Sequence, residues 1–121
     1  MFIPCKGKTG TAYFEFQYCK KEWTGGNFME SGYSYWEEDS LLIHVDEADL
    51  FFDQYGKYFR CPQAVSGVSK LEYCGENYYS KEQTAQILQR IKKECPQEHE
   101  PLIAWLEKAV TEYNGFFMIG I

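Results

Sequence analysis

The sequence predicts an α+β fold in a single domain that spans residues 1–121. Three observations favour it: aromatic and polar residues alternate in the first half, two helical patterns follow each other in the second half, and the last six residues are almost wholly apolar. A period of two is typical of half-buried strands, and apolar side chains three and four positions apart are typical of amphipathic helices. We therefore expect an antiparallel or mixed sheet with two consecutive C-terminal helices packed on one face and a C-terminal strand returning to it.

Length and composition exclude several broad classes of protein. The 121 residues correspond to one domain, and an aromatic content of 18% argues against disorder. No apolar run approaches the ~20 residues of a membrane span, and the first residues lack the apolar stretch of a secretory signal, so we expect a cytoplasmic protein without membrane contact. The formal net charge of −6 has the wrong sign for direct nucleic-acid binding.

The first half of the chain contains three predicted strands. Residues 11–20 alternate aromatic and polar side chains, which predicts a half-buried strand. Tyr33 and Tyr35 indicate a second strand, and the apolar run 41–45 indicates a third. The polar residues 37–40 lie between these two and are typical of a hairpin loop.

A short helix and a further strand are predicted in the middle of the chain. Asp46 follows the apolar run and precedes more acidic residues, which is typical of a helix start. Gly56 is the expected end of this helix. A strand is predicted over residues 65–73, with Gly67 as a weak point of this strand or a bulge in it.

The two C-terminal helices have the clearest local signals. Ser80 and Gln83 have the spacing of a capping box, and Pro96 ends the helix that they begin. Pro101 can open the next helix, and Gly115 lies where the end of a helix often needs a positive φ. The expected buried stripes are Thr84, Ile87, Leu88 and Ile91 in the first helix, and Leu102, Trp105, Leu106, Ala109 and Tyr113 in the second.

Residues able to carry catalysis or bind a cofactor are scarce. The five cysteines are odd in number and contain no C-x-x-C pair, so we expect reduced thiols and no metal or cofactor. Of the two histidines, His44 lies within a predicted strand and His99 in a polar loop, and neither is paired with a nucleophile. Phosphate-binding and zinc-protease motifs are missing, so we expect a protein that is not an enzyme.

The distribution of charge points to protein binding. Residues 22–56 contain no Lys or Arg but hold nine of the 18 acidic residues and eight aromatic residues. Charge of one sign attracts an oppositely charged partner and speeds its association, and Tyr and Trp are frequent anchors of interfaces. The predicted partner-binding residues are Tyr35, Trp36, Glu37, Glu38, Asp39, Asp46, Glu47, Asp49 and Asp53. An equally weighted alternative is that the aromatic residues form the core and the acidic residues only keep the surface soluble.

One segment resembles a known family. The run Tyr-Tyr-Ser-Lys-Glu-Gln at residues 78–83, within the stretch 74–91, is similar to the strand-to-helix junction of small bacterial immunity proteins. These proteins accompany polymorphic and contact-dependent growth-inhibition toxins. The resemblance implies a cytoplasmic inhibitor of a cognate toxin domain, which in many such systems is a nuclease with a basic substrate channel. It implies no particular site residue in this chain.

Three other interpretations remain open. The protein could be an adaptor or regulatory module for another basic protein. It could bind a metal or a small molecule around His44 and nearby acids such as Asp46, although Asp46, Asp49 and Asp53 lack the ligand order of a calcium loop. Finally, the apolar C-terminal strand, if it lay at a sheet edge, would allow a homodimer.

Overall fold

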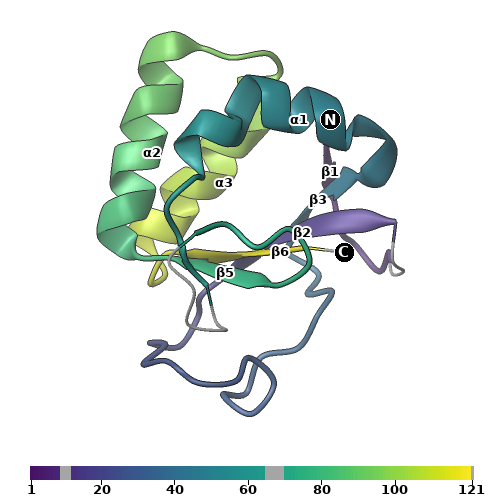
Figure 1. The fold of residues 1–121 in the computed structure, drawn as a ribbon. Helices are drawn as coiled ribbons and strands as arrows, with labels where there is room; N and C mark the ends of the chain where they lie inside the picture. Colours follow the sequence, from purple (N-terminus) through teal and green to yellow (C-terminus); the bar gives the residue numbers. More distant parts are fainter. Residues whose placement is uncertain (9–11, 65–69, 121) are drawn as a thin grey trace.

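The computed structural model describes residues 1–8, 12–64 and 70–120, and it has an α+β fold (Figure 1). Its sheet has six strands in the order β1-β3-β2-β6-β5-β4, and every neighbouring pair is antiparallel. The predicted fold class is therefore confirmed, with the antiparallel alternative as the correct one. The strands are β1 Phe2–Pro4, β2 Tyr13–Tyr18, β3 Leu41–His44, β4 Gln63–Ala64, β5 Glu76–Tyr79 and β6 Phe116–Ile119.

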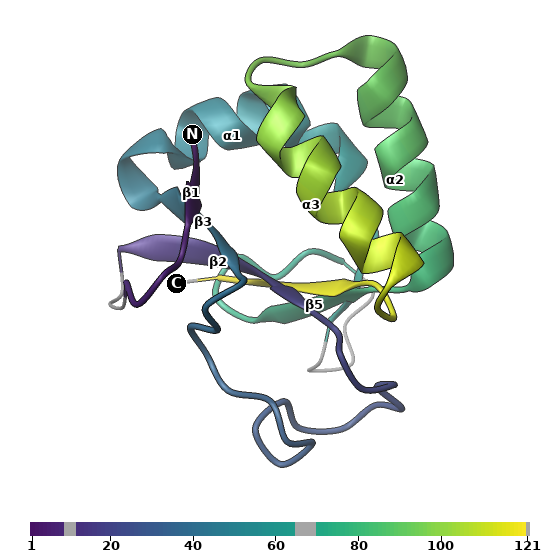
Figure 2. The same cartoon turned by 180° about the vertical axis from the view of Figure 1, so that it is seen from behind.

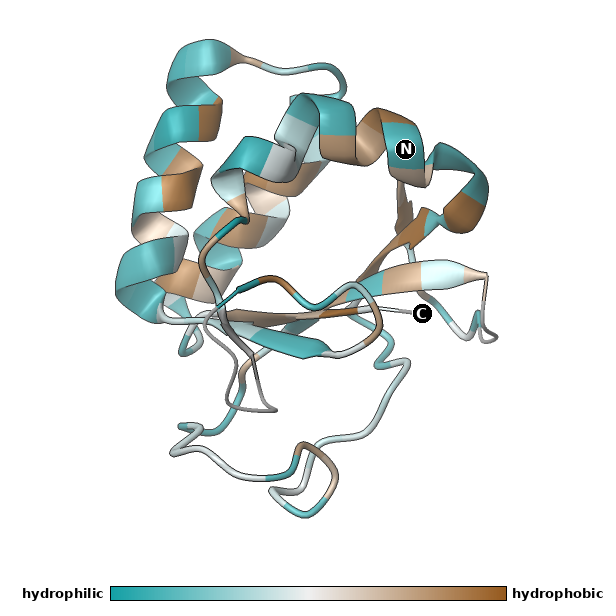
Figure 3. Ribbon diagram, viewed as in Figure 1, coloured by the Kyte–Doolittle hydropathy of each residue, from teal (hydrophilic) through white to brown (hydrophobic). Residues whose placement is uncertain are grey.

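Three helices cover one face of this sheet (Figures 1 and 2). They are α1 Ala48–Tyr55, α2 Lys81–Glu94 and α3 His99–Thr111, and α1 is flanked by the short 3₁₀ helices η1 Val45–Glu47 and η2 Gly56–Tyr58. Each helix is hydrophilic outward and apolar toward the sheet (Figure 3). Across the described part of the chain, no helix combines the length and apolar character needed to cross a bilayer.

The C-terminal strand lies in the centre of the sheet. β6 pairs with β2 on one side and with β5 on the other, and Phe116 lies between Tyr18 and Tyr79 in the register. All four of its residues are buried. The predicted return of the chain to the sheet is confirmed. The expected homodimer required this strand to lie at a sheet edge. β6 has a neighbour on each side, so it has no free edge that could pair with a second copy.

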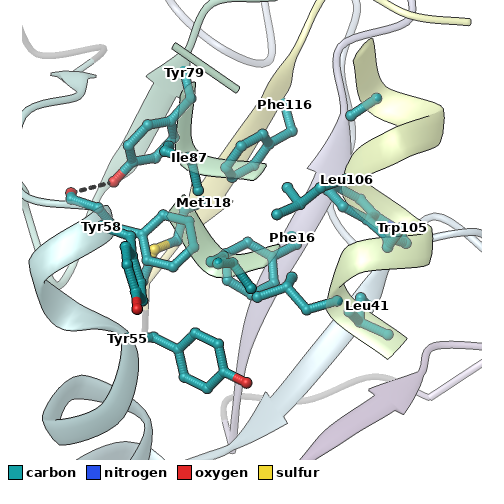
Figure 4. Close-up of a cluster of buried hydrophobic side chains, with 14 of the residues drawn as sticks. Phe16, Leu41, Tyr55, Tyr58, Tyr79, Ile87, Trp105, Leu106, Phe116 and Met118 are labelled. Carbon is teal, nitrogen blue, oxygen red and sulfur yellow. Dashed lines mark hydrogen bonds between the residues drawn. The ribbon is translucent and has the colours of Figure 1, made fainter. Parts of the chain in front are cut away.

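The main core fills the space between the helices and the sheet (Figure 4). Phe16 and Phe116 project from adjacent central strands and contact Trp105 of α3, with ring centroids 5.9 and 5.6 Å away. Tyr79 stacks on Phe116 at 4.8 Å, and its hydroxyl donates to the Phe59 carbonyl at 2.5 Å. The expected stripes of α2 and α3 are buried here, except that Tyr113 is only half-buried.

A second, smaller core lies on the opposite face of the sheet. The long connection between β2 and β3, residues 19–40, crosses this face below the strands (Figures 1 and 2). Phe117 and Ile119, the alternate residues of β6, are buried there. Their cover is aromatic and comes from the connection: Trp23, Phe28 and Tyr33.

The structure of this connection shows that the hairpin predicted for residues 33–45 is wrong. Residues 33–40 contain no strand, although Tyr33 and Tyr35 alternate as a strand would. Their rings stack on Phe28 at 5.4 and 5.2 Å instead of standing on opposite sides of a sheet. Burial of aromatic area against Phe117 therefore outweighs the local preference for an extended strand.

Two details in the middle of the chain also differ from expectation. The cap of η1 is His44, whose Nδ1 accepts from the Asp46 N–H at 3.1 Å, so Asp46 lies inside the 3₁₀ turn. The predicted strand over 65–73 falls partly outside the described residues, and residues 70–73 are not in a strand. The strand that precedes α2 is β5 instead.

The predicted capping box of α2 is confirmed. The Ser80 hydroxyl accepts from the Gln83 N–H at 3.1 Å, and the Gln83 side chain accepts from the Ser80 N–H at 2.9 Å. We expect Ser80→Ala to lower the free energy of unfolding by about 1 kcal/mol, because one N–H of the first turn loses its acceptor. Urea denaturation measures the change, and Gln89→Ala on the exposed side of α2 is the control. Equal midpoints for the two variants would contradict the prediction.

Candidate partner-binding surface

The nine predicted partner-binding residues form two groups, separated by β3. Tyr35 to Asp39 precede this strand, and Asp46 to Asp53 follow it. The four residues of β3 span about 13 Å, so the two groups lie at opposite ends of the strand. The expectation of one continuous acidic face is therefore too simple, and each group has its own surroundings.

The first group, residues 35–39, is called the acidic loop. It is held by Glu15, a β2 residue with only 1% of its side chain exposed. The Glu15 carboxylate accepts from the backbone N–H of Trp36 at 3.0 and 3.1 Å and from that of Glu37 at 3.3 Å. It also accepts from the Ser40 hydroxyl at 2.5 Å.

Glu15 has no cationic partner among the residues that the structure describes. The amide of Gln17 adds a further donor, 3.0 Å from Glu15 and 2.8 Å from the Ser34 carbonyl. Hydrogen bonds from backbone and side chains thus replace the water that the buried carboxylate has lost. The alternation in β2 places Glu15 and Gln17 away from the helices, but only the tertiary fold shows that the connection 19–40 buries them.

Nearby groups partly neutralise the acidic loop. Lys20 Nζ lies 2.7 Å from the Asp39 carboxylate, and this hydrogen bond raises the pKa of Lys20. The Tyr35 ring is 41% exposed, and its hydroxyl donates to Glu76 at 2.5 Å, which raises the pKa of Tyr35 to about 12. Trp36 is half-buried against Tyr13. The charge left to a partner is therefore smaller than the sequence run indicates.

The second group lies on η1 and α1. Asp46, Asp49 and Asp53 are exposed, and their spacing of three and four residues places them along one side of the helix. Within the described part of the chain, no Lys or Arg lies within ion-pair distance of any of the three. This charge is uncompensated.

The turn between α2 and α3 adds more acidic residues to this side of the molecule. The N-terminal amine lies 2.7 Å from Glu98 and 3.7 Å from Glu47, so these two carboxylates share one cation. Tyr55 donates to the Gln97 carbonyl at 2.5 Å, which ties α1 to the same turn. Burial, with the carboxylates of Glu98 and Glu100 nearby, raises the pKa of Tyr55.

The acidic surface is defined here as Asp46, Glu47, Asp49, Asp53, Glu98 and Glu100. Its last two members were missed by sequence reasoning. They lie more than 40 positions from α1, and no local pattern links the two segments. Val45, which is 43% exposed, lies at one end of this surface and adds an apolar contact point.

The surroundings of His44 do not form a metal centre. Its Nδ1 is occupied by the Asp46 N–H, and its ring packs on Tyr13 with centroids 5.2 Å apart. Over the ranges 1–8, 12–64 and 70–120, no group of three or more His, Cys, Asp or Glu side chains could hold a metal ion. All five cysteines are free, and burial raises the pKa of Cys5 and Cys19.

No family model, curated protein or solved structure matches the chain significantly. The function must therefore be inferred from the surface of the protein itself.

Proposed function

We propose that this protein is a cytoplasmic immunity protein that binds and neutralises a basic partner, the toxic domain of a cognate bacterial toxin. The observation that carries the proposal is the acidic surface. Glu47 of η1 and Glu98 of the α2–α3 turn lie within 3.7 Å of the same amine, and α1, with its exposed aspartates, is tied to that turn through Tyr55. Histidines aside, the N-terminal amine shared by Glu47 and Glu98 is the one cation that the described residues bring within ion-pair distance of this surface. The similarity of residues 78–83 to the immunity family agrees with this role.

The acidic surface suits the basic channel of a nuclease. Such a channel holds phosphates with Lys and Arg, and carboxylates on a rigid helix can occupy the same cations. Asp49 and Asp53 are one helical turn apart, about 6 Å along the axis of α1. Electrostatic attraction would speed the encounter, and Val45 would supply apolar contact at the margin. In this mechanism the inhibitor blocks the channel and has no catalytic role.

The acidic loop is a second contact region in this proposal. Tyr35 is an exposed aromatic side chain, and Glu37 and Glu38 carry the charge that Lys20 does not neutralise. Because Glu15 holds the loop in place, a partner would meet it already ordered, which lowers the entropic cost of binding. An adaptor for another basic protein would use the same surfaces, and a growth-rescue assay with the product of the adjacent upstream gene distinguishes the two roles.

Association kinetics with that gene product test the acidic surface. We expect the triple variant Asp46→Ser, Asp49→Ser, Asp53→Ser to associate about 10- to 100-fold more slowly and with a weaker dependence on salt. The matched control is Glu22→Ser, Glu30→Ser, Glu112→Ser, which removes the same charge from other exposed positions. Equal association rates for the two triple variants would contradict the proposed role of the acidic surface. Glu37→Ser, Glu38→Ser, measured in parallel, tests the acidic loop.

A further inference from the structure

A cavity of about 850 Å³ lies between the C-terminal end of α1 and residues 70–74. Its lining includes three cations and three apolar or aromatic side chains, and we call it the cationic groove: Phe52, Lys57, Arg60, Lys70, Leu71 and Tyr73. One carboxylate, Glu72, also lines it. The groove is thus locally cationic in a protein whose formal net charge is −6.

Two of the three cations have no ion-pair partner among the described residues. Lys57 is bound to Glu94 at 2.5 Å. Arg60 and Lys70 are exposed, and no carboxylate of the described residues lies within ion-pair distance of either. Arg and Lys together are the usual protein ligands of phosphate groups, with Arg offering two parallel donors.

The wall that carries Tyr73 is held by buried groups. Asn77, which is 1% exposed, accepts from the Glu72 N–H at 2.7 Å and donates to the Glu72 carbonyl at 2.8 Å. The Gly120 N–H donates to the Gly75 carbonyl at 2.9 Å. The Tyr73 ring is 57% exposed and rests edge-on against Phe52, with centroids 5.0 Å apart. An exposed ring on a fixed support is a stacking platform for another flat ring.

The opposite wall is equally well supported. Phe59, next to Arg60, accepts the Tyr79 hydroxyl through its carbonyl. Arg90 donates to the Lys57 carbonyl at 3.4 Å and lies 4.9 Å from the centre of the Tyr58 ring. A smaller hollow of about 170 Å³ lies next to the cationic groove and shares Lys57 and Arg60 with it. Arg90 lines this smaller hollow. Positive charge therefore continues along this wall.

We propose that the cationic groove binds a small phosphorylated ligand with a flat ring, of the nucleotide class. Arg60 and Lys70 would hold the phosphates, and Tyr73 would stack on the ring. The cavity lies within the size range of about 300–1,000 Å³ that small-ligand sites occupy. This site is separate from the acidic surface and goes beyond the proposed immunity function, so either can fail without the other.

Calorimetric titration of the full chain with ADP, pyrophosphate and adenosine tests the proposal. We expect ADP to bind most tightly, because only ADP uses both the phosphate and the ring contacts. Arg60→Gln, Lys70→Gln should weaken ADP binding by about 10- to 100-fold, the loss expected for charged hydrogen bonds. Tyr73→Ala should weaken the binding of ADP but not of pyrophosphate. The control is Lys93→Gln, an exposed cation of α2 outside the groove.

Three results would overturn the proposal. They are the lack of saturable ADP binding, equal ADP affinity in the double variant and in Lys93→Gln, and tighter binding of a single-stranded oligonucleotide than of ADP. Thermal melts establish that each variant is folded. The single variant Lys70→Gln repeats the test at an exposed position if the double variant unfolds.

Discussion

Replacing Glu15 with alanine is expected to lower the free energy of unfolding by about 3–5 kcal/mol. The substitution removes the acceptor of the Trp36 N–H, the Ser40 hydroxyl and the Gln17 amide at a site that is 1% exposed. Each donor left buried without a partner costs about 1–3 kcal/mol, and alanine leaves space that only water could fill. Urea denaturation followed by tryptophan fluorescence measures the loss.

The variant Glu15→Gln separates the effect of lost side-chain volume from the effect of lost hydrogen bonds. Glutamine keeps the volume of glutamate, but its amide nitrogen would face the N–H groups that now donate to the carboxylate. We expect an intermediate loss of about 1–3 kcal/mol. Hydrogen exchange should quicken at the Trp36 and Glu37 amides and stay unchanged in α2. Glu38→Ala, an exposed acid in the acidic loop, is the control and should change stability by less than about 0.5 kcal/mol.

If Glu15→Ala left the free energy of unfolding unchanged, the hydrogen bonds of this carboxylate would not be what holds the acidic loop in place. The same result would weaken the proposal that the loop meets its partner already ordered. The proposed binding surface and a buried polar network are thus linked through one residue of β2, Glu15. A loss of stability in Glu15→Ala should therefore be accompanied by faster hydrogen exchange in the acidic loop.

The elements that could be predicted from the sequence are those with local signals. The capping residue Ser80 and the break at Pro96 mark the bounds of α2 through contacts within a few residues of each other. The apolar stretch 116–121 predicts a buried strand because so much apolar surface cannot remain in water. Its pairing with β2 and β5 is a long-range property, and no pattern in the stretch itself specifies it.

The failed prediction of a strand at Tyr33 and Tyr35 has a physical cause. Alternating aromatic residues are favoured in strands because they fit a half-buried surface. Here Tyr33 is buried against Phe117, which lies more than 80 positions away, while Tyr35 stacks on Phe28 and stays exposed. The segment is therefore a cover over the sheet and not a strand within it. A local pattern cannot distinguish these two uses of the same residues.

The candidate partner-binding surface, too, has some features that local sequence patterns predict and others that only the tertiary fold determines. The spacing of Asp49 and Asp53 is local and predicts that they share one side of α1. The pairing of Asp39 with Lys20 and the arrival of Glu98 beside the N-terminal amine depend on the tertiary fold. A run of unbalanced charge in the sequence therefore overstates the charge at one end of β3 and understates it at the other.

The second large effect is expected at Gly115, which joins α3 to the central strand β6. Its φ is +85°, and a Cβ there would overlap the carbonyl oxygen of Tyr79. Its own N–H donates to the Ala109 carbonyl at 3.2 Å, and its carbonyl accepts from Cys19 at 3.1 Å. The backbone is thus held on both sides and cannot move away from Tyr79 without breaking these bonds.

We expect Gly115→Ala to lower the free energy of unfolding by about 3 kcal/mol or more, because backbone strain and steric overlap add. Gly7 provides a matched control, since its φ is +87° and a Cβ there would meet nothing within 4 Å. Gly7→Ala should cost only the strain, about 1–2 kcal/mol. Urea denaturation measures both losses, and the difference between them reports the steric overlap of the new Cβ with the Tyr79 carbonyl oxygen. Equal losses would contradict the close approach of the Tyr79 carbonyl to Gly115, because a Cβ at Gly7 would meet no atom within 4 Å.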